Sequence, residues 1–267
     1  MRFSEDTTYS FVIGRIRARE ALLLRRSDYE RLINVENDEE ILKELQSRYQ
    51  LEDIEEQAVD LEKFLNLAYW ENQMFFQKYC RDRDLYNLVV DRTILERSLL
   101  LEYLRKFNND FLNHYFTTTV DLENIRNALR IKYLSEKTDS SLFSVNKDLN
   151  QIWLKGGKIA FKEAVKYFLE PWPTIIDWAS KTEYASCLVE GIEYLLGQNS
   201  FLRLERKIEE AKQQILLWTR YLVFGYEPLI AYYLFKDNEI RNLRRIHRGI
   251  KVKVSSERLK ESIACVL

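Results

Sequence analysis

The stretch that decides the fold is KDNEIRNLRRIHRGIKVKVSSERLKESI, residues 236–263. Its first part predicts a helix, because apolar residues and arginines recur at three- and four-residue steps and fall on opposite faces. The apolar stripe is Ile240, Leu243, Ile246 and Ile250, and the arginine face is Arg241, Arg244, Arg245 and Arg248. Ser255 and Ser256 fit the N-cap of a second helix, because a serine hydroxyl can accept a hydrogen bond from a first-turn amide.

Two other segments resemble this unit of a helix, a short connection and a second helix, which favours a diverged internal repeat. They are YSFVIGRIRAREALLLRRSDYERLI, residues 9–33, and VDLENIRNALRIKYLSEKTDSS, residues 120–141. When the two segments are aligned, Asn124 matches Asn242 at a separation of 118 residues (242 − 124), and Arg130 then matches Arg248. Gly14 stands at the matching place in the first segment. The alternative is that three arginine-rich amphipathic helices share this composition by chance.

The rest of the chain also favours helices, because only 7 Gly and 3 Pro are spread over 267 residues. One apolar seam, repeating at three and four residues, consists of Ile54, Ala58, Leu61, Leu65 and Ala68. A second seam consists of Leu204, Ile208, Ala211, Ile215, Trp218 and Leu222. We expect a further long helix between Asp84 and Phe107 to be the antiparallel neighbour of the first seam. The prediction is an all-α fold.

Turn-forming residues mark where the helices should end. These places are Asn34–Asp38, Asn108–Asp110, Lys137–Ser141, Lys155–Lys158, Glu170–Pro173 and Gly197–Ser200. The connections between them are short, so the chain reads as roughly a dozen helices.

Charge and composition limit the classes of function. The chain has 41 Lys and Arg against 42 Asp and Glu, which argues against a surface that tracks a phosphate backbone throughout. The apolar window 221–235 is interrupted by Glu227 and Pro228 and is shorter than the ~20 residues that cross a bilayer. Any contact with a membrane is therefore expected from outside it. The three cysteines are far apart in the sequence, which favours free thiols.

The sequence offers no convincing catalytic or metal-binding pattern. His114 and His247 are the two histidines, and neither has a partner residue at ligand spacing. KGGK at 155–158 lacks the further residues of a phosphate-binding loop and reads as a turn. Glu227 is most simply an acidic residue in the first turn of a helix. We therefore expect no catalytic residue, no metal ligand and no cofactor.

The arginine face of the opening stretch allows two interpretations. Residues 236–260 hold nine Lys or Arg against three acidic residues, an excess of six. Guanidinium groups on one face repel one another and favour an anionic or carbonyl-rich partner. Alternatively, the helix is solvated and its arginines have acidic neighbours within the chain.

Three segments resemble the C subunit of the archaeal and bacterial A/V-type rotary ATPases, whose eukaryotic vacuolar counterpart is called the d subunit. They are YSFVIGRIRAREALLL (9–24), DLENIRNALRIKYL (121–134) and YEPLIAYYLFKDNEIRNLRRIHRGIKVKVSSERL (226–259). The glycine pair at Gly156 and Gly157 also fits this family.

The resemblance implies an all-α, pseudo-threefold funnel of three related helical modules. The modules would lie at about 1–110, 111–224 and 225–267, the third completed by preceding helices. It further implies a non-catalytic rotor adaptor that couples the central stalk to the membrane proteolipid ring in ATP-linked proton or sodium transport. Such a protein lies peripherally on the cytoplasmic face of the membrane, needs no cofactor and binds no nucleic acid. The alternative is a free-standing helical-repeat adaptor that binds an acidic protein or RNA through its basic C-terminal helix.

The resemblance and the repeat together give a set of candidate partner-binding residues. They are Arg15, Arg17, Asn124, Arg126, Arg130, Arg241, Asn242, Arg244, Arg245 and Arg248. The chain departs from the family pattern in its short length and in Gly14, where the other two segments have asparagine. These departures place the contacts of the first segment in doubt more than the fold.

Overall fold

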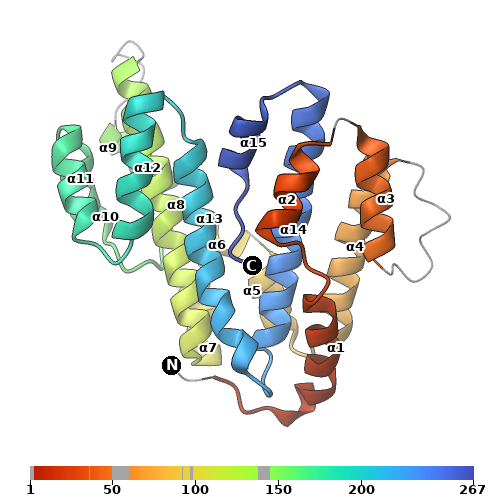
Figure 1. Ribbon diagram of the computed structural model, residues 1–267. Coiled ribbons are helices and arrows are strands. Elements are labelled where there is room, and N and C mark those ends of the chain that lie inside the picture. Colours follow the sequence, from red (N-terminus) through yellow and green to blue (C-terminus); the bar gives the residue numbers. More distant parts are fainter. Residues whose placement is uncertain (1–2, 36, 50–59, 92, 97–98, 138–144) are drawn as a thin grey trace. The chain divides into compact units, whose positions relative to one another are not determined.

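The structure is a computed structural model that describes residues 3–35, 37–49, 60–91, 93–96, 99–137 and 145–267 (Figure 1). Within these ranges all regular secondary structure is helical, which confirms the all-α prediction. The chain divides into two compact units. Unit 1 is built mainly from Asn87–Ile215, and unit 2 from Phe3–Tyr86 together with Leu216–Leu267. The pseudo-threefold funnel and its three modules stay predictions.

Unit 2 is assembled around one long helix, α14 (Glu227–Lys251). The other helices of this unit are η1 (Thr7–Tyr9), α1 (Ser10–Glu20), α2 (Arg26–Ile33), α3 (Asp38–Arg48), α4 (Leu61–Tyr79), η2 (Leu217–Tyr221) and α15 (Ser256–Ser262). Helix α14 packs against α1, α2, α4 and α15, and α4 is its most extensive neighbour. Leu243 and Ile246 of α14 join a core formed by the helices on either side.

The local sequence explains where α14 and α15 begin. Pro228 lies in the first turn of α14, where its missing N–H is not needed. Ser255 caps α15, because its hydroxyl accepts a hydrogen bond from the Arg258 amide at 3.4 Å. This confirms the cap expected from the sequence. The predicted apolar stripe of α14 is confirmed too, since Ile240, Leu243 and Ile246 are buried and Ile250 is half-buried against the same core.

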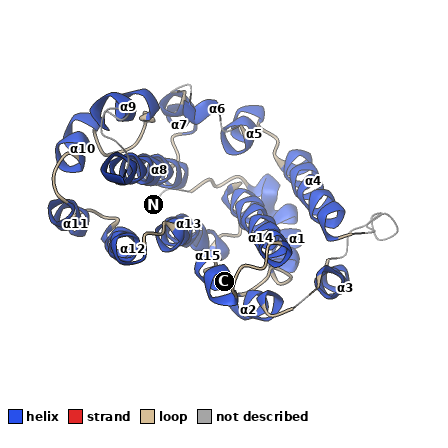
Figure 2. Ribbon diagram, turned by 90° about the horizontal axis from the view of Figure 1, so that it is seen from above, coloured by secondary structure: helices blue, strands red, loops and turns tan. Residues whose placement is uncertain are grey.

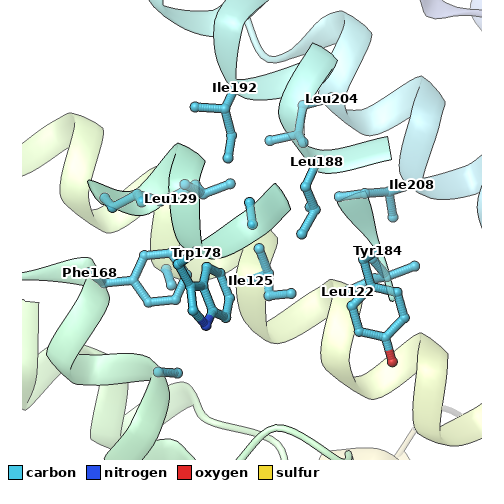
Figure 3. Packing of buried hydrophobic residues seen from close by; sticks show 14 of the residues in the cluster. Leu122, Ile125, Leu129, Phe168, Trp178, Tyr184, Leu188, Ile192, Leu204 and Ile208 are labelled. Atoms are coloured by element: carbon cyan, nitrogen blue, oxygen red, sulfur yellow. The ribbon is translucent and has the colours of Figure 1, made fainter. Parts of the chain in front are cut away.

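Unit 1 is centred on a second long helix, α8 (Asp110–Lys137). The remaining helices are α6 (Thr93–Glu96), α7 (Leu100–Phe107), α9 (Val145–Ile152), α10 (Phe161–Phe168), α11 (Trp172–Ser180), α12 (Ala185–Gln198) and α13 (Leu202–Leu216). Figure 2 looks along α8 and shows α9 to α12 in an arc around it. Leu122, Ile125 and Leu129 of α8 meet side chains from α10 to α13 in one apolar core (Figure 3). Helix α5 (Arg83–Val90) spans the division between the units.

The expected single helix between Asp84 and Phe107 is wrong. The described part of that stretch forms three helices, α5, α6 and α7. Helix α5 ends at Val90, and the Asp91 side chain accepts a hydrogen bond at 2.9 Å from the amide of Thr93, the first residue of α6. The main neighbour of the first seam is α14 rather than this stretch, from which α5 contacts α4 through the stacked rings of Tyr86 and Phe76.

The two apolar seams are confirmed in part. Leu61, Leu65 and Ala68 are buried on α4, whereas Ile54 and Ala58 lie outside the described residues. Leu204, Ile208 and Ile215 of the second seam are buried on α13, and Ala211 is half-buried. It does not continue as predicted, because η2 replaces the α-helix after Leu216 and the Trp218 side chain is 55% exposed.

Most of the expected turns are found, and the one at Lys137–Ser141 lies outside the described residues after Lys137. Asn108 and Asn199 adopt the left-handed conformation at the ends of α7 and α12, as a residue that stops a helix often does. Pairs α1–α2 and α14–α15 reproduce the predicted helix, connection and helix, and α8 is followed by α9 after residues outside the described part. None of the helices described here combines the length and apolar character needed to span a bilayer.

Candidate functional site

Three of the four arginines on the predicted arginine face of α14 are bound within unit 2. Arg241 forms an ion pair with Asp237 at 3.2 Å, one turn earlier on the same helix. Arg244 donates to the Asn66 Oδ1 at 3.0 Å and lies over the Tyr69 ring of α4. Arg245 donates to the Asn242 Oδ1 at 3.1 Å and to the Ser262 carbonyl at 3.2 Å. For these three residues the structure favours the interpretation of partners within the chain.

Arg248 differs from these arginines. Its side chain is exposed, and it forms no ion pair with any residue that the structure describes. The same holds for Lys253, Arg258 and Lys260, which follow Arg248 around the connection into α15. We name Arg248, Lys253, Arg258 and Lys260 the basic end of α14. Of the predicted site residues on this helix, Arg248 alone belongs to it.

The basic end is held by a defined turn. The Val254 amide donates to the Gly249 carbonyl at 2.9 Å, and the Lys253 amide donates to the Ile250 carbonyl at 3.1 Å. This pair of bonds closes a helix with one residue in the left-handed region, usually glycine. Here that residue is Lys253, with φ of 55°. The backbone therefore presents a lysine where its conformation favours glycine.

A pocket of about 360 Å³ lies beside the basic end, within unit 2. Its acidic lining comes from the first turns of α3 and α4 and the residues that begin them: Asp38, Glu39, Asp60 and Glu62. His247 and Lys251 of α14 line the same pocket, and the His247 Nδ1 lies 2.9 Å from the Asp38 Oδ1. Negative and positive surface thus lie next to each other at this end of α14.

The predicted residue Asn242 faces the interior and is fully buried. Its amide donates to the Ala264 carbonyl at 2.8 Å, which ties the segment after α15 back onto α14. Three residues earlier, buried Glu239 accepts from the Leu24 amide, the Tyr49 hydroxyl and the Lys236 ammonium group. Burial and then the Glu239 charge raise the pKa of Tyr49 well above its ordinary value.

The predicted residue Asn124 on α8 has the same role in unit 1. Its side-chain nitrogen donates to the Leu154 carbonyl at 2.9 Å, and its side-chain oxygen accepts from the Leu154 amide at 2.8 Å. Three residues earlier, Asp121 accepts from the Lys158 and Ile159 amides at 3.0 Å each and from the Tyr184 hydroxyl at 2.8 Å. Both predicted asparagines thus lie inside their units.

The other predicted arginines of unit 1 are half-buried and paired. Arg126 pairs with Glu123 on its own helix. Arg130 of α8 pairs with Glu205 of α13 and lies over the Phe201 ring. The Arg130 contacts hold α8 to α13 and to the residue before it, within the unit.

The first segment differs from the other two. Arg15 is exposed and donates to the Tyr79 hydroxyl at 2.8 Å. Arg17 is half-buried and donates to the Thr219 and Leu222 carbonyls at 2.8 Å each, which fastens α1 to the connection before α14. Gly14 is exposed, and a Cβ atom there would meet nothing within 4 Å. The buried asparagine of the other segments therefore has no counterpart at Gly14.

Sequence reasoning missed the buried acids and, of the basic end, Lys253, Arg258 and Lys260. The acids could have been found, because an acidic residue precedes each asparagine by three positions in DLEN (121–124) and EIRN (239–242). One turn of helix places such a pair on the same face. The spacing of the arginines could not show which of them are paired within the chain, because the partners Asn66 and Ser262 lie elsewhere in the sequence.

Unit 2 also exposes apolar side chains before α14 begins. Trp218 is 55% exposed and Tyr221 is 90% exposed, and Val223 and Phe224 follow them on the same connection. Hydrogen bonds hold this connection: the Gly225 amide donates to the Asp6 carbonyl at 3.0 Å, and buried Glu227 accepts from the Ser4 amide. No group of three or more His, Cys, Asp or Glu residues in the described ranges is arranged to hold a metal ion.

Comparison with known proteins gives a consistent result. The family model for the ATP synthase (C/AC39) subunit matches residues 73–262. The chain is 22% identical over 153 residues to the C subunit of the A-type ATP synthase from two strains of Halobacterium salinarum, covering 56% of this chain and 40% of the relative. It is 22% identical over 174 residues to the corresponding protein of Haloquadratum walsbyi, covering 64% of this chain and 47% of the relative.

The matched part thus spans less than half of the length of these curated relatives. No solved structure matches the chain significantly.

Proposed function

Because the chain belongs to the ATP synthase (C/AC39) subunit family, we propose that it is a non-catalytic rotor adaptor in an A/V-type ATPase or ATP synthase. It couples the central stalk to the membrane proteolipid ring, and so links ATP hydrolysis or synthesis to proton or sodium transport. The family match over residues 73–262, which includes α8 and α14, is the observation that carries this proposal. Partner subunits of the complex supply the reaction and the ion path.

Helix α14 supports the mechanical part of the proposal. Its 25 residues correspond to a rod of about 37 Å, at ~1.5 Å per residue. Most of its length is buried against α1, α2, α4 and α15. A helix clamped along its length resists bending, which a part that transmits torque requires. The basic end begins in its last turn, and the exposed apolar side chains from Trp218 to Phe224 precede its first turn, so the helix offers contact surfaces at both ends.

The adaptor is proposed to lie peripherally on the cytoplasmic face of the membrane as part of the complex. Its partners are the central-stalk subunits and the proteolipid ring. Of the residues predicted from the sequence, the exposed Arg15 and Arg248 are the ones best placed for such contacts. Asn124 and Asn242 contribute indirectly, because they hold the main chain around the long helices.

Affinity purification tests this proposal. The tagged chain is expressed in its own organism, recovered from a mild detergent extract and analysed by mass spectrometry. Recovery of both central-stalk subunits and the proteolipid subunit is expected. Recovery of neither, in an extract whose ATPase complex is intact by native electrophoresis, would contradict the proposal.

A second candidate function is a free-standing adaptor that binds an acidic protein or RNA. The observation in its favour is the basic end of α14, which has no ion-pair partner among the described residues. Binding to RNA falls steeply with salt, because each phosphate contact releases counterions. Co-purification of RNA that is lost as salt is raised from about 50 to about 300 mM, without stalk or proteolipid subunits, would favour this alternative.

A further inference from the structure

We propose that the basic end of α14, formed by Arg248, Lys253, Arg258 and Lys260, is the docking surface for an acidic protein partner. Under the proposed function, on which this inference rests, the partner is the end of the central stalk. The arginine face predicted from the sequence is not the docking surface, because three of its four members are bound within unit 2.

The cations of the basic end are available to a partner. Along residues 236–251, most positively charged side chains bind partners within the chain. Lys236 is buried beside Glu239, Arg241 pairs with Asp237, and Arg245 donates to the Ser262 carbonyl. After them the pattern changes. Residues 248–260 hold five Lys or Arg and one acidic residue, Glu257, an excess of four. Four of the five form the basic end.

Lys253 supplies an independent observation. A turn with this hydrogen-bond pattern favours glycine at the position of Lys253. A residue that has a Cβ atom is strained there, because the backbone φ is 55°. Strain of this kind is held by the surrounding structure and is found at functional positions. The Lys253 side chain is exposed and contributes charge to the surface rather than contacts to the core. Docking explains why a lysine stands there.

The surroundings favour a protein over a lipid bilayer or a nucleic acid. The acidic pocket lies beside the basic end, and Lys251 lines it with His247. An anionic bilayer or an RNA presents one sign of charge and would be repelled by the four carboxylates of the pocket. A protein surface can pair acidic side chains with the basic end and a basic side chain with the pocket. Val252, 72% exposed, adds apolar contact area between them.

The test uses the purified full-length chain and, as the probe, the purified central-stalk subunits of the same complex. Affinity is measured by isothermal titration calorimetry at about 50, 150 and 300 mM salt, and wild-type affinity is expected to fall as salt rises. The double charge reversal R248E/K253E is expected to weaken binding roughly tenfold or more at about 150 mM salt. The matched control K162E/K166E reverses two exposed lysines of α10 and is expected to bind within about twofold of wild type.

A second variant separates docking from folding. Lys253→Gly relieves the strained backbone and removes one charge, so it should raise the melting temperature and weaken binding. A purely structural role for Lys253 would leave the affinity unchanged. Circular dichroism in the far ultraviolet should give the same helicity for all variants.

Three outcomes would overturn the inference. If wild type binds the stalk subunits and R248E/K253E binds equally well, the docking surface lies elsewhere while the proposed function stands. Phosphatidylglycerol vesicles and RNA are tested in the same way. If wild type binds one of them and R248E/K253E loses that binding, while both bind the stalk subunits equally well, the partner is not a protein. If wild type binds no stalk subunit, the proposed function fails and this partner with it.

Discussion

Asn124 and Asn242, 118 residues apart in the sequence (242 − 124), make the same kind of contact in two different units. Each is buried on a long helix, and each uses its side-chain amide to hold a main-chain carbonyl beyond the next helix, at Leu154 for Asn124 and at Ala264 for Asn242. Each also follows a buried acid by three residues, and each acid accepts from a tyrosine hydroxyl and a backbone amide. Such correspondence in detail favours a true repeat over a chance likeness in composition.

Removal of the Asn124 amide should destabilise unit 1. In Asn124→Ala the Leu154 amide and carbonyl both lose their partner, and we expect the free energy of unfolding to fall by about 2–3 kcal/mol. Urea denaturation followed by circular dichroism measures this. Asn150→Ala, on the exposed side of α9, is the control and should unfold like wild type. Equal stability of the two variants would show that the Asn124 contacts contribute little.

Two glycines should respond in opposite ways to alanine. A Cβ atom on Gly157 would lie 2.1 Å from the Asp121 Oδ1, so Gly157→Ala must displace the buried carboxylate and should cost about 2–3 kcal/mol. A Cβ atom on Gly197 meets nothing within 4 Å, and Gly197 lies in α12. Gly197→Ala should therefore gain roughly 0.5 kcal/mol from helix propensity. Thermal unfolding of both variants tests this, and a stable Gly157→Ala protein would contradict the close packing.

Tyr184 should make stability sensitive to alkaline pH. Burial and then the Asp121 charge raise its pKa above the value of about 10 for an unfolded chain. Its contribution is therefore fully present below about pH 10 and is lost as the pH rises toward the folded pKa. Tyr184→Phe loses the bond to Asp121, about 1 kcal/mol at neutral pH, and should lose less stability than wild type as the pH is raised above about 10.

Tyr221→Phe is the control for this experiment, because Tyr221 is 90% exposed. It should follow wild type at every pH in urea titrations. If Tyr184→Phe also follows wild type at alkaline pH, ionisation of Tyr184 is not coupled to unfolding.

Two neighbouring arginines of α14 should differ in how much their side chains contribute to stability. Arg245→Ala removes bonds to the Asn242 side chain and the Ser262 carbonyl and should lower stability by about 1–2 kcal/mol. Arg248→Ala removes an exposed side chain without an ion pair to the described residues and should leave stability unchanged. The melting temperatures of the two variants decide this. Equal losses would place Arg248 in the same network as Arg245.

Much of the fold was predictable from the sequence, because local rules determine helices. The spacing of Ile240, Leu243 and Ile246 predicted the buried face of α14, and Ser255 predicted the start of α15. The alignment of Asn124 with Asn242 identified two residues that have equivalent contacts. For the α14 stripe and the Ser255 cap, the signal and the structure lie within one or two helical turns, and for the asparagines the repeat itself supplied the signal.

Predictions failed where the outcome depended on distant parts of the chain. A periodic seam shows that a helix packs on a partner, but it does not identify that partner. The stretch 84–107 was therefore predicted as the neighbour of α4, whereas its main neighbour is α14. The break at Asp91 was missed because the leucine periodicity continues through it, although the Asp91 side chain binds the first amide of α6. The arginines of α14 share one pattern, but partners such as Asn66 and Ser262 determine which of them remain free.

Bridging of two partners tests the central claim most directly. Purified central-stalk subunits and detergent-solubilised proteolipid ring of the same complex are mixed with and without the chain, and the masses of the particles are measured by mass photometry. The account predicts that a particle containing stalk and ring forms only when the chain is present, and contains the chain. Stalk and ring that associate equally well without the chain, or a chain that joins neither, would contradict it.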